Sequence, residues 1–554
     1  MTPNSIADFS LQAATKYLQS AVFIDDNIYN QVTANPDVGD VKVRLPKKVM
    51  RTEQAADQLL EKQSPEVEES ESAEQPVPPF RTKDLVGSFA EHGIVCALYE
   101  PEEGFETGEN STIFKLCQTA DLVILDWDFH KDGVSGTKPK ALIERLIKSG
   151  NLVAPHHVRL IAIYTNTQSL HSIANSLFQH LEKNEIKPRP IECEFRLEAG
   201  SSRVVILGKA GVVDRVEQEK LFTVTEKDLA NCLLSEFSKM NQGILPSCAL
   251  LGMAAVRQSS ARILDKFHGD LDAQFLLHRA LIRGSEEAFD QLPELLGDEF
   301  RAVMEDAYYS PKDLEQFVSE SCSVVPVKSH VSPWKVDGRP GEEVLKEFWS
   351  KDSESTERLV GRKTVNQSDG AQPRKPVEAL AAMCSVNDTD AQHKFAALLA
   401  VRTQYQTKYR GLGFGSIILD RNSGEYWVCV MPACDSIRLK GKTNFPFWNL
   451  VKSGNGHPVI VQCGEDKWVR LVFDVGKPSK YMRLAEFTPD DGRKIVLAAR
   501  ENGKEVFKSG NAEYEWVAQL KPSHAQRMAN IIGQQLSRVG LTEAEWARVV
   551  FAKE

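Results

Sequence analysis

Four short apolar runs, each ending in a polar residue, constrain this chain more than any other feature of its sequence. They lie within residues 21–26, 121–128, 160–165 and 204–209. Short apolar runs that are separated by helical stretches predict buried parallel strands. In an open α/β sheet, ligands bind at the carboxyl ends of the strands. We therefore expect the polar endings of the four runs to meet in one small site.

The polar endings share a possible chemical use. They are Asp25 and Asp26 after the first run, Asp126 after the second, Thr165 after the third and Lys209 after the fourth. The three carboxylates can hold Mg²⁺, which prefers carboxylate oxygens and water and would offset the charge of an incoming phosphoryl group. Asp126 is the predicted nucleophile, because a carboxylate can accept a phosphoryl group as an aspartyl phosphate. Thr165 and Lys209 can bind phosphoryl oxygens through a hydroxyl group and a positive charge.

At these five positions the chain resembles the receiver domain of two-component response regulators. The resemblance implies Mg²⁺ as cofactor, a histidine kinase as phosphoryl donor, Asp126 as phospho-acceptor and the backbone carbonyl of Asp128 as a further metal ligand. Three positions depart from the family's usual pattern: Asn166 replaces a small residue, Ile206 a frequent aromatic residue and Ala210 a proline. The resemblance therefore implies intact acceptor chemistry with an altered output switch.

Length and composition restrict the function further. A chain of 554 residues predicts several domains, because single cores rarely exceed roughly 250–300 residues. The net charge of −10 argues against a general nucleic-acid binder, which would show a basic patch. No apolar run approaches the roughly 18 residues of a membrane span, and no signal pattern is present. The ten cysteines form no Cys-x-x-Cys pair, which predicts reduced thiols. We expect a soluble cytoplasmic protein without membrane or nucleic-acid partners.

The first of three predicted domains covers residues 1–242. Its expected fold is α/β, a receiver-like doubly wound parallel sheet with insertions. One insertion, at about residues 30–80, is predicted to be flexible, because residues 63–79 are rich in Glu, Ser and Pro and contain almost no large apolar side chain. An additional strand over residues 192–197 would make the sheet larger than usual.

The two remaining domains differ in the spacing of their apolar residues. Residues 243–404 show the three- and four-residue spacing of helices, with a polar linker at about residues 351–376. Residues 405–554 contain short strand-like runs and predict a β-rich α+β domain. Within it, an Asn-Ser-Gly turn predicts a hairpin over residues 416–431, and apolar spacing predicts a helix over residues 524–539.

Two motifs of the C-terminal domain could serve as a nucleophile or a phosphate-binding loop, and each also has a structural interpretation. Cys434 beside Asp435 could be a nucleophile, but a reactive cysteine needs a nearby histidine or cation, and only Arg438 is close in sequence. We interpret Cys434 as a buried structural cysteine. The G-L-G-F-G run at residues 411–415 does not open a predicted helix, so we interpret it as a lead into a strand rather than a phosphate-binding loop.

The whole layout is similar to the phosphate-buffer receiver proteins of the Detocs bacterial anti-phage two-component defence system, which combine an enlarged receiver with a β-rich region and a segment like residues 432–439. This resemblance implies a protein that takes phosphoryl groups from a histidine kinase onto Asp126 and limits activation of a second response regulator or effector. Such a protein is no enzyme beyond self-catalysed phosphotransfer and autodephosphorylation. Two alternatives stay open. One is a receiver that regulates an effector enzyme with a cryptic C-terminal active site, and the other is a pseudo-receiver that acts as a docking scaffold.

Overall fold

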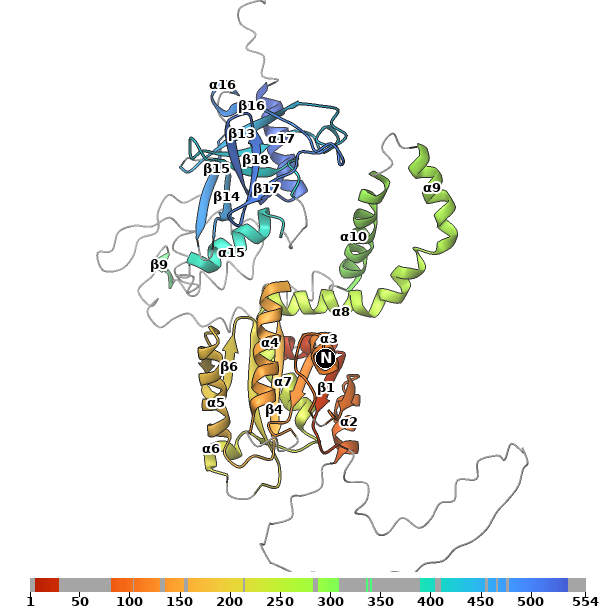
Figure 1. Ribbon diagram of the computed structural model, residues 1–554, viewed down its shortest axis with the longest axis vertical. Helices are drawn as coiled ribbons and strands as arrows, with labels where there is room; N and C mark the ends of the chain where they lie inside the picture. Colours follow the sequence, from red (N-terminus) through yellow and green to blue (C-terminus); the bar gives the residue numbers. More distant parts are fainter. Residues whose placement is uncertain are drawn as a thin grey trace, which may run out of the picture. The chain divides into compact units, whose positions relative to one another are not determined.

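A computed structural model describes the chain in segments, which are residues 5–28, 81–102, 104–129, 135–153, 158–212, 215–281, 287–307, 335–336, 339–340, 389–403, 410–453, 457–464, 467–474 and 478–536 (Figure 1). The insert predicted at residues 30–80 and the linker predicted at residues 351–376 lie outside these segments. Two compact units divide the chain, Met1–Phe267 with Gly297–Ser310 and His268–Leu296 with Pro311–Glu554. None of the helices in the described segments is long and apolar enough to span a membrane.

The first unit is built on an eight-stranded sheet of order β2-β1-β3-β4-β7-β6-β5, with β8 paired to β7. Five successive strands, from β2 at one edge to β7, are parallel. They are β1 (Ser20–Ile24), β2 (Val95–Tyr99), β3 (Leu122–Leu125), β4 (Arg159–Thr165) and β7 (Ser202–Lys209). Four of these strands are the four apolar runs, and their order is that of a doubly wound sheet. The predicted α/β fold of this unit is therefore confirmed.

Three further strands extend the sheet on the side of β7. β6 (Cys193–Ala199) runs antiparallel to the first half of β7 and pairs with β5 (Arg189–Ile191). β8 (Thr223–Val224) runs parallel to the last two residues of β7. The predicted extra strand is confirmed as β6. Neither β5 nor β8 was predicted, because two or three residues are too few to show an alternating pattern.

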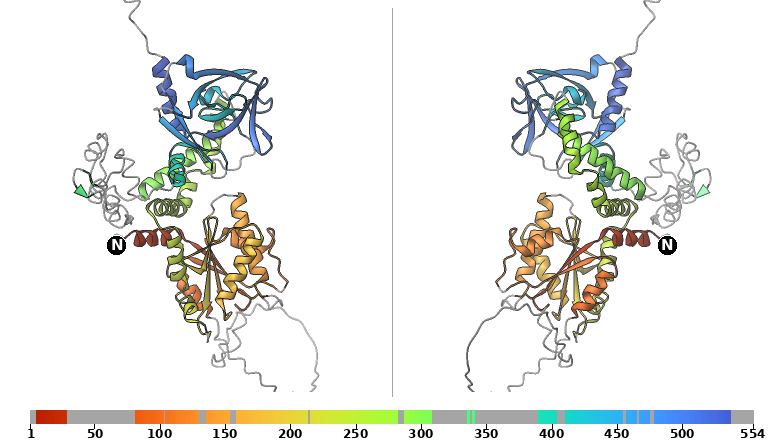
Figure 2. Two further views of the ribbon diagram at one scale, coloured as in Figure 1. Left: turned by 90° about the vertical axis from the view of Figure 1, so that its left-hand side faces the viewer. Right: turned by 90° about the vertical axis from the view of Figure 1, so that its right-hand side faces the viewer.

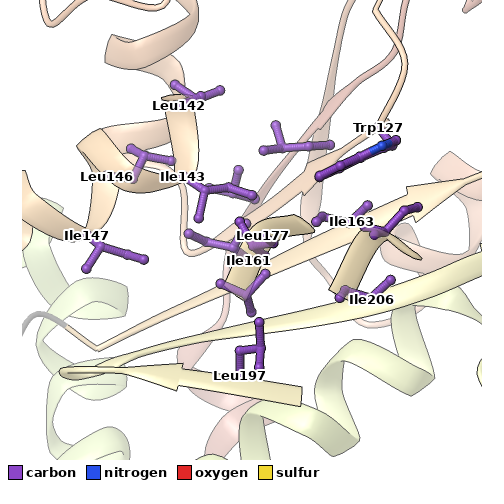
Figure 3. Packing of buried hydrophobic residues seen from close by; sticks show 14 of the residues in the cluster. Trp127, Leu142, Ile143, Leu146, Ile147, Ile161, Ile163, Leu177, Leu197 and Ile206 are labelled. Atoms are coloured by element: carbon purple, nitrogen blue, oxygen red, sulfur yellow. The ribbon is translucent and has the colours of Figure 1, made fainter. Parts of the chain in front are cut away.

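Helices cover both faces of this sheet, as the two side views show (Figure 2). One face carries α1 (Ile6–Tyr17), α2 (Thr82–Ala90) and α7 (Leu229–Met240), and the other carries α3 (Thr112–Thr119), α4 (Thr137–Val153) and α5 (Leu170–Lys183). Strand side chains alternate between the two cores, so Phe23 of β1 faces α1 while Val22 faces α4. Figure 3 shows the second core, where Leu142 and Ile143 of α4 lie over Ile161 of β4. Burial on both faces explains the continuous apolar runs.

Helix α8 (Ile244–Asp265) follows α7, and both helices pack against α1. The hydroxyl group of Ser247 lies 2.9 Å from that of Ser10 in a buried contact between α8 and α1. Further along the chain are η1 (Gly269–Leu271), α9 (Asp272–Leu281), α10 (Glu287–Ala307), the two-residue strands β9 (Lys335–Val336) and β10 (Arg339–Pro340), and α15 (Thr389–Ala400). The described parts of the middle region are therefore mostly helical, whereas residues 308–334, 337–338 and 341–388 lie outside the described segments.

The second unit contains a nine-stranded antiparallel sheet of order β14-β15-β13-β12-β11-β19-β18-β17, with β16 paired to β13. The strands are β11 (Ser416–Asp420), β12 (Tyr426–Cys429), β13 (Thr443–Val451), β14 (His457–Gln462), β15 (Trp468–Phe473), β16 (Met482–Phe487), β17 (Ala499–Glu501), β18 (Lys504–Ser509) and β19 (Ala512–Gln519). Short helices η3 (Ala433–Asp435) and α16 (Pro478–Tyr481) lie in its loops, and α17 (Pro522–Leu536) follows β19. The predicted hairpin is confirmed as β11 and β12, and the β-rich α+β character is confirmed as well.

Candidate functional site

The carboxyl ends of the parallel strands carry all five side chains that the sequence singled out. Asp25 and Asp26 follow β1, Asp126 follows β3, Thr165 ends β4 and Lys209 ends β7. These side chains are buried, with exposed fractions between 1% and 8%. The three aspartates and Lys209 are charged groups shielded from solvent. They must neutralise one another or bind an ion, because burying an unpaired charge costs free energy.

The three aspartates form a compact group of oxygen ligands. One carboxylate oxygen from each of Asp25, Asp26 and Asp126 lies within 4.8 Å of the other two. Two oxygens on opposite sides of one Mg²⁺ lie about 4.2 Å apart, so three carboxylates at this spacing can share the cation after small side-chain adjustments. The Oδ1 atom of Asp126 is buried and accepts no hydrogen bond. A buried carboxylate oxygen without a hydrogen-bond donor, beside two further carboxylates, fits a metal ligand.

Lys209 carries the positive charge of the site. Its Nζ atom lies 2.5 Å from Oδ2 of Asp25 and 3.6 Å from Oδ1 of Asp126. Burial by itself would lower the pKa of Lys209, but the negative charges of Asp126 and Asp25 outweigh it, so the pKa is raised. The lysine is therefore charged and lies where it can bind a group attached to Asp126.

The pKa of the Asp126 carboxyl group is strongly raised. Burial raises its pKa to about 7. The charge of Lys209 opposes this shift, the charge of Asp25 adds to it, and hydrogen bonds from the Thr165 hydroxyl and the Trp127 backbone lower the pKa. Before a cation binds, Asp126 thus holds a proton more readily than an ordinary aspartate does.

Asn27 orients two of the acidic residues and was not found from the sequence. Its backbone N–H donates to Oδ1 of Asp25, and its side-chain amide donates to Oδ1 of Asp26, both at 2.9 Å. Bonds of this kind hold carboxylate ligands in place before the metal arrives. A single asparagine after an acidic pair has no distinctive spacing, so no sequence signal pointed to this role.

A chain of hydrogen bonds joins the loop after β3 to the loop after β4. The carboxylate of Asp128 accepts hydrogen bonds from the hydroxyl groups of Thr167, at 3.0 Å, and Ser135. The backbone N–H of Thr167 in turn donates to the Thr165 hydroxyl at 3.2 Å. The side chain of Asp128 therefore braces this edge of the site, a role that the sequence did not suggest. Metal binding by its backbone carbonyl stays a prediction.

The motifs of the C-terminal domain form no comparable site. Cys434 is exposed on η3, and its Sγ lies 3.5 Å from Oδ1 of the adjacent Asp435. Within the described segments, the contacts of Cys434 include no histidine or cationic group. In the glycine run, Gly415 has a φ of +80° and packs where a Cβ atom would lie 2.9 Å from Ala525. The prediction of a buried Cys434 is therefore wrong, because η3 places this thiol at the surface, whereas the close packing of Gly415 favours the structural interpretation of the glycine run.

Comparison with known families agrees with this geometry. A family model described as "Response receiver domain" matches residues 17–214. The match contains all five residues of the site and the five successive parallel strands. No curated protein and no solved structure matches the chain. The chain therefore carries a receiver domain, which forms most of its first unit.

Proposed function

We propose that this protein is a phosphoryl acceptor of a two-component system, in which Asp126 takes the phosphoryl group from the phosphohistidine of a histidine kinase. The observation that carries the proposal is the group of Asp25, Asp26 and Asp126, with the buried Oδ1 of Asp126 lacking a hydrogen-bond donor. The receiver-domain match over residues 17–214 supports it. Asp25, Asp26 and Asp126 would hold Mg²⁺.

The residues of the site account for the transfer. An oxygen of ionised Asp126 attacks phosphorus, while the bond from phosphorus to the histidine nitrogen breaks and its electron pair stays on that nitrogen, which takes up a proton. Lys209 and Thr165 bind phosphoryl oxygens through a charge and a hydroxyl group, so positioning and charge neutralisation supply most of the rate. Bound Mg²⁺ would neutralise further phosphoryl charge.

More specifically, we propose that the protein acts as a phosphate buffer in an anti-phage two-component system. The protein would compete with a second response regulator or effector for the phosphoryl groups of one histidine kinase, and would perform no catalysis beyond its own phosphorylation and dephosphorylation. Apolar side chains cover both faces of the sheet in the second unit. This packing is consistent with a domain that performs no catalysis. The Sγ atom of Cys434 contacts the carboxylate of Asp435, a group that cannot favour a thiolate, so this contact gives no support to a cryptic C-terminal active site.

Transfer of radioactive phosphate tests the acceptor function. Full-length protein with Mg²⁺ and labelled acetyl phosphate should incorporate acid-stable, base-labile label. Asp126→Asn should incorporate none, whereas Asp435→Asn, which changes an exposed aspartate of the second unit, should label like the wild type. Label that persists in Asp126→Asn would place the acceptor elsewhere and refute the proposal.

The buffer role needs a competition experiment. A phosphorylated histidine kinase that transfers label to this protein is mixed with a second receiver that it also phosphorylates, with and without the present protein. Wild-type protein should reduce the label on the second receiver in proportion to its concentration, and Asp126→Asn should not. If the wild type takes label from the kinase but leaves the second receiver unaffected, the acceptor function stands and the buffer role fails.

A further inference from the structure

Arg215 belongs to no predicted motif, yet its side chain is buried beside the site, with an exposed fraction of 3%. Its Nη1 donates to the backbone carbonyl of Lys209 at 2.7 Å and to the hydroxyl group of Thr223 at 3.1 Å. Its Nη2 donates to the backbone carbonyls of Thr165 and Thr167 at 3.0 and 3.1 Å. One guanidinium group therefore joins the loop that follows Thr165 to the loop that follows Lys209.

The position of Arg215 explains why such a bridge is needed. β4 and β7 pair in parallel up to Thr165 and Gly208, where the ladder between them ends. The carbonyl groups of Thr165, Thr167 and Lys209 lie at or just beyond this last pair, and Arg215 donates hydrogen bonds to all three. Its rigid planar fork suits this task, because it can donate to several acceptors at fixed angles, which a lysine cannot do.

Neighbouring residues leave room for the guanidinium group and tolerate its charge. A Cβ atom on Gly208 would lie 2.0 Å from Nη1 of Arg215, so only glycine at this position leaves space for the bridge. Burial lowers the pKa of Arg215, and the charge of Glu219 opposes that shift. Holding a cation in a buried place is unfavourable, so a group that only had to fill space here would be better apolar.

We propose that Arg215 is a positioning residue for phosphoryl acceptance, which holds the Thr165 hydroxyl and the Lys209 ammonium group at the separation required to bind two oxygens of one phosphoryl group. This inference rests on the proposed function. Displacement of a positioned group by about 1 Å can reduce a rate about 100-fold. Arg215 acts through these two residues, since its own hydrogen bonds end on Thr223 and on backbone carbonyls.

The loops that Arg215 contacts predict different effects on two quantities, the rate of phosphoryl uptake and the affinity for Mg²⁺. Its hydrogen bonds reach the loops after β4 and β7, whereas the three carboxylates belong to the loops after β1 and β3. Loss of the bridge should therefore slow phosphoryl uptake while the affinity for Mg²⁺ stays within about threefold of the wild-type value. A residue that merely supported the fold would change both quantities together.

Two variants remove the bridge by independent routes. Arg215→Lys keeps the charge but loses the planar fork, and Gly208→Ala displaces the guanidinium group with a methyl group. The matched control is Arg203→Gln, which changes a buried arginine of β7 whose carboxylate partner is Glu198. For each full-length protein we would measure label uptake at saturating acetyl phosphate and Mg²⁺, and the Kd of Mg²⁺ alone by calorimetry.

We expect about 100-fold slower uptake in Arg215→Lys and in Gly208→Ala, with nearly unchanged Mg²⁺ affinity, and wild-type values for both quantities in Arg203→Gln. Uptake at the wild-type rate in Arg215→Lys would overturn the positioning role and leave the proposed function intact. Parallel loss of uptake and Mg²⁺ binding in both bridge variants would show a structural role and also overturn it. Wild-type protein that takes up no label would refute the proposed function itself.

Discussion

Arg257 of α8 forms a two-pronged ion pair with Asp121, in which Nη1 donates to Oδ1 and Nη2 donates to Oδ2, each at 3.0 Å. Asp121 immediately precedes β3, the strand that leads to Asp126 at its other end. The same carboxylate accepts hydrogen bonds from the backbone N–H groups of Gln19 and Ser20 at 3.0 and 3.1 Å. A single ion pair therefore fixes α8 to the amino ends of β1 and β3.

Removing this ion pair should loosen α8. Arg257→Ala leaves a half-buried carboxylate without its charged partner, which we expect to lower the free energy of local opening by about 2 kcal/mol. Amide hydrogens of α8 should then exchange about 30-fold faster, measured by mass spectrometry. Arg262→Ala, an exposed change on the same helix, should have little effect. Equal exchange in the wild type and Arg257→Ala would show that the pair contributes nothing.

The affinity for Mg²⁺ should depend on pH through Asp126. Because burial raises the pKa of Asp126 to about 7, the metal-free carboxyl group holds a proton below that pH, and the cation must displace it. The Kd of Mg²⁺ should therefore rise about tenfold for each unit of pH below 7 and level off above it. Calorimetric titrations between about pH 5.5 and 8.5 would measure this. A flat profile would mean that Asp126 is already ionised.

The hydrogen bonds of Asn27 should contribute to metal affinity. Asn27→Ala removes the amide that orients Asp26 and leaves the backbone hydrogen bond to Asp25 in place. Loss of one orienting partner typically weakens metal binding about tenfold, and calorimetry with Mg²⁺ measures the change. Asn444→Ala, at an exposed asparagine of the second unit, serves as control. An unchanged Kd in Asn27→Ala would show that Asp26 needs no such support.

Gly136 should tolerate no side chain. Its φ is +76°, and a Cβ atom there would lie 2.1 Å from the Trp127 ring. Gly136→Ala should destabilise the first unit by about 3 kcal/mol, because the new methyl group adds backbone strain and displaces the buried indole beside Asp126. Urea-dependent hydrogen exchange of β3 measures this change.

The matched control for that substitution is Gly108→Ala, where a Cβ atom meets nothing within 4 Å. It should leave the exchange of β3 close to the wild-type level. Comparable stability of the two alanine variants would show that the loop around Trp127 moves aside without strain, contrary to our expectation.

Much of the receiver domain could be predicted from the sequence because its signals are local. A strand buried on both faces must be apolar along its whole length, so β3 and β4 are visible as short apolar runs. The polar residue that ends each run marks the carboxyl end of a strand. Because these ends meet on one side of a parallel sheet, Asp126 and Lys209 could be placed beside one another from the sequence. The hairpin of β11 and β12 was equally visible, since its turn residues adjoin both strands.

Arg215 beside the site and Arg257 at the amino end of β3 could not be predicted, because their partners are remote in sequence or lack a side-chain signature. Arg215 bonds mainly to backbone carbonyls, which every residue possesses, and Arg257 meets Asp121 across 136 positions of sequence. The sequence by itself determined the strands and the reactive groups at their ends, since burial and chain direction leave a periodic trace. Only the tertiary structure decided which buried cations brace those groups, because such contacts depend on how distant segments pack in space.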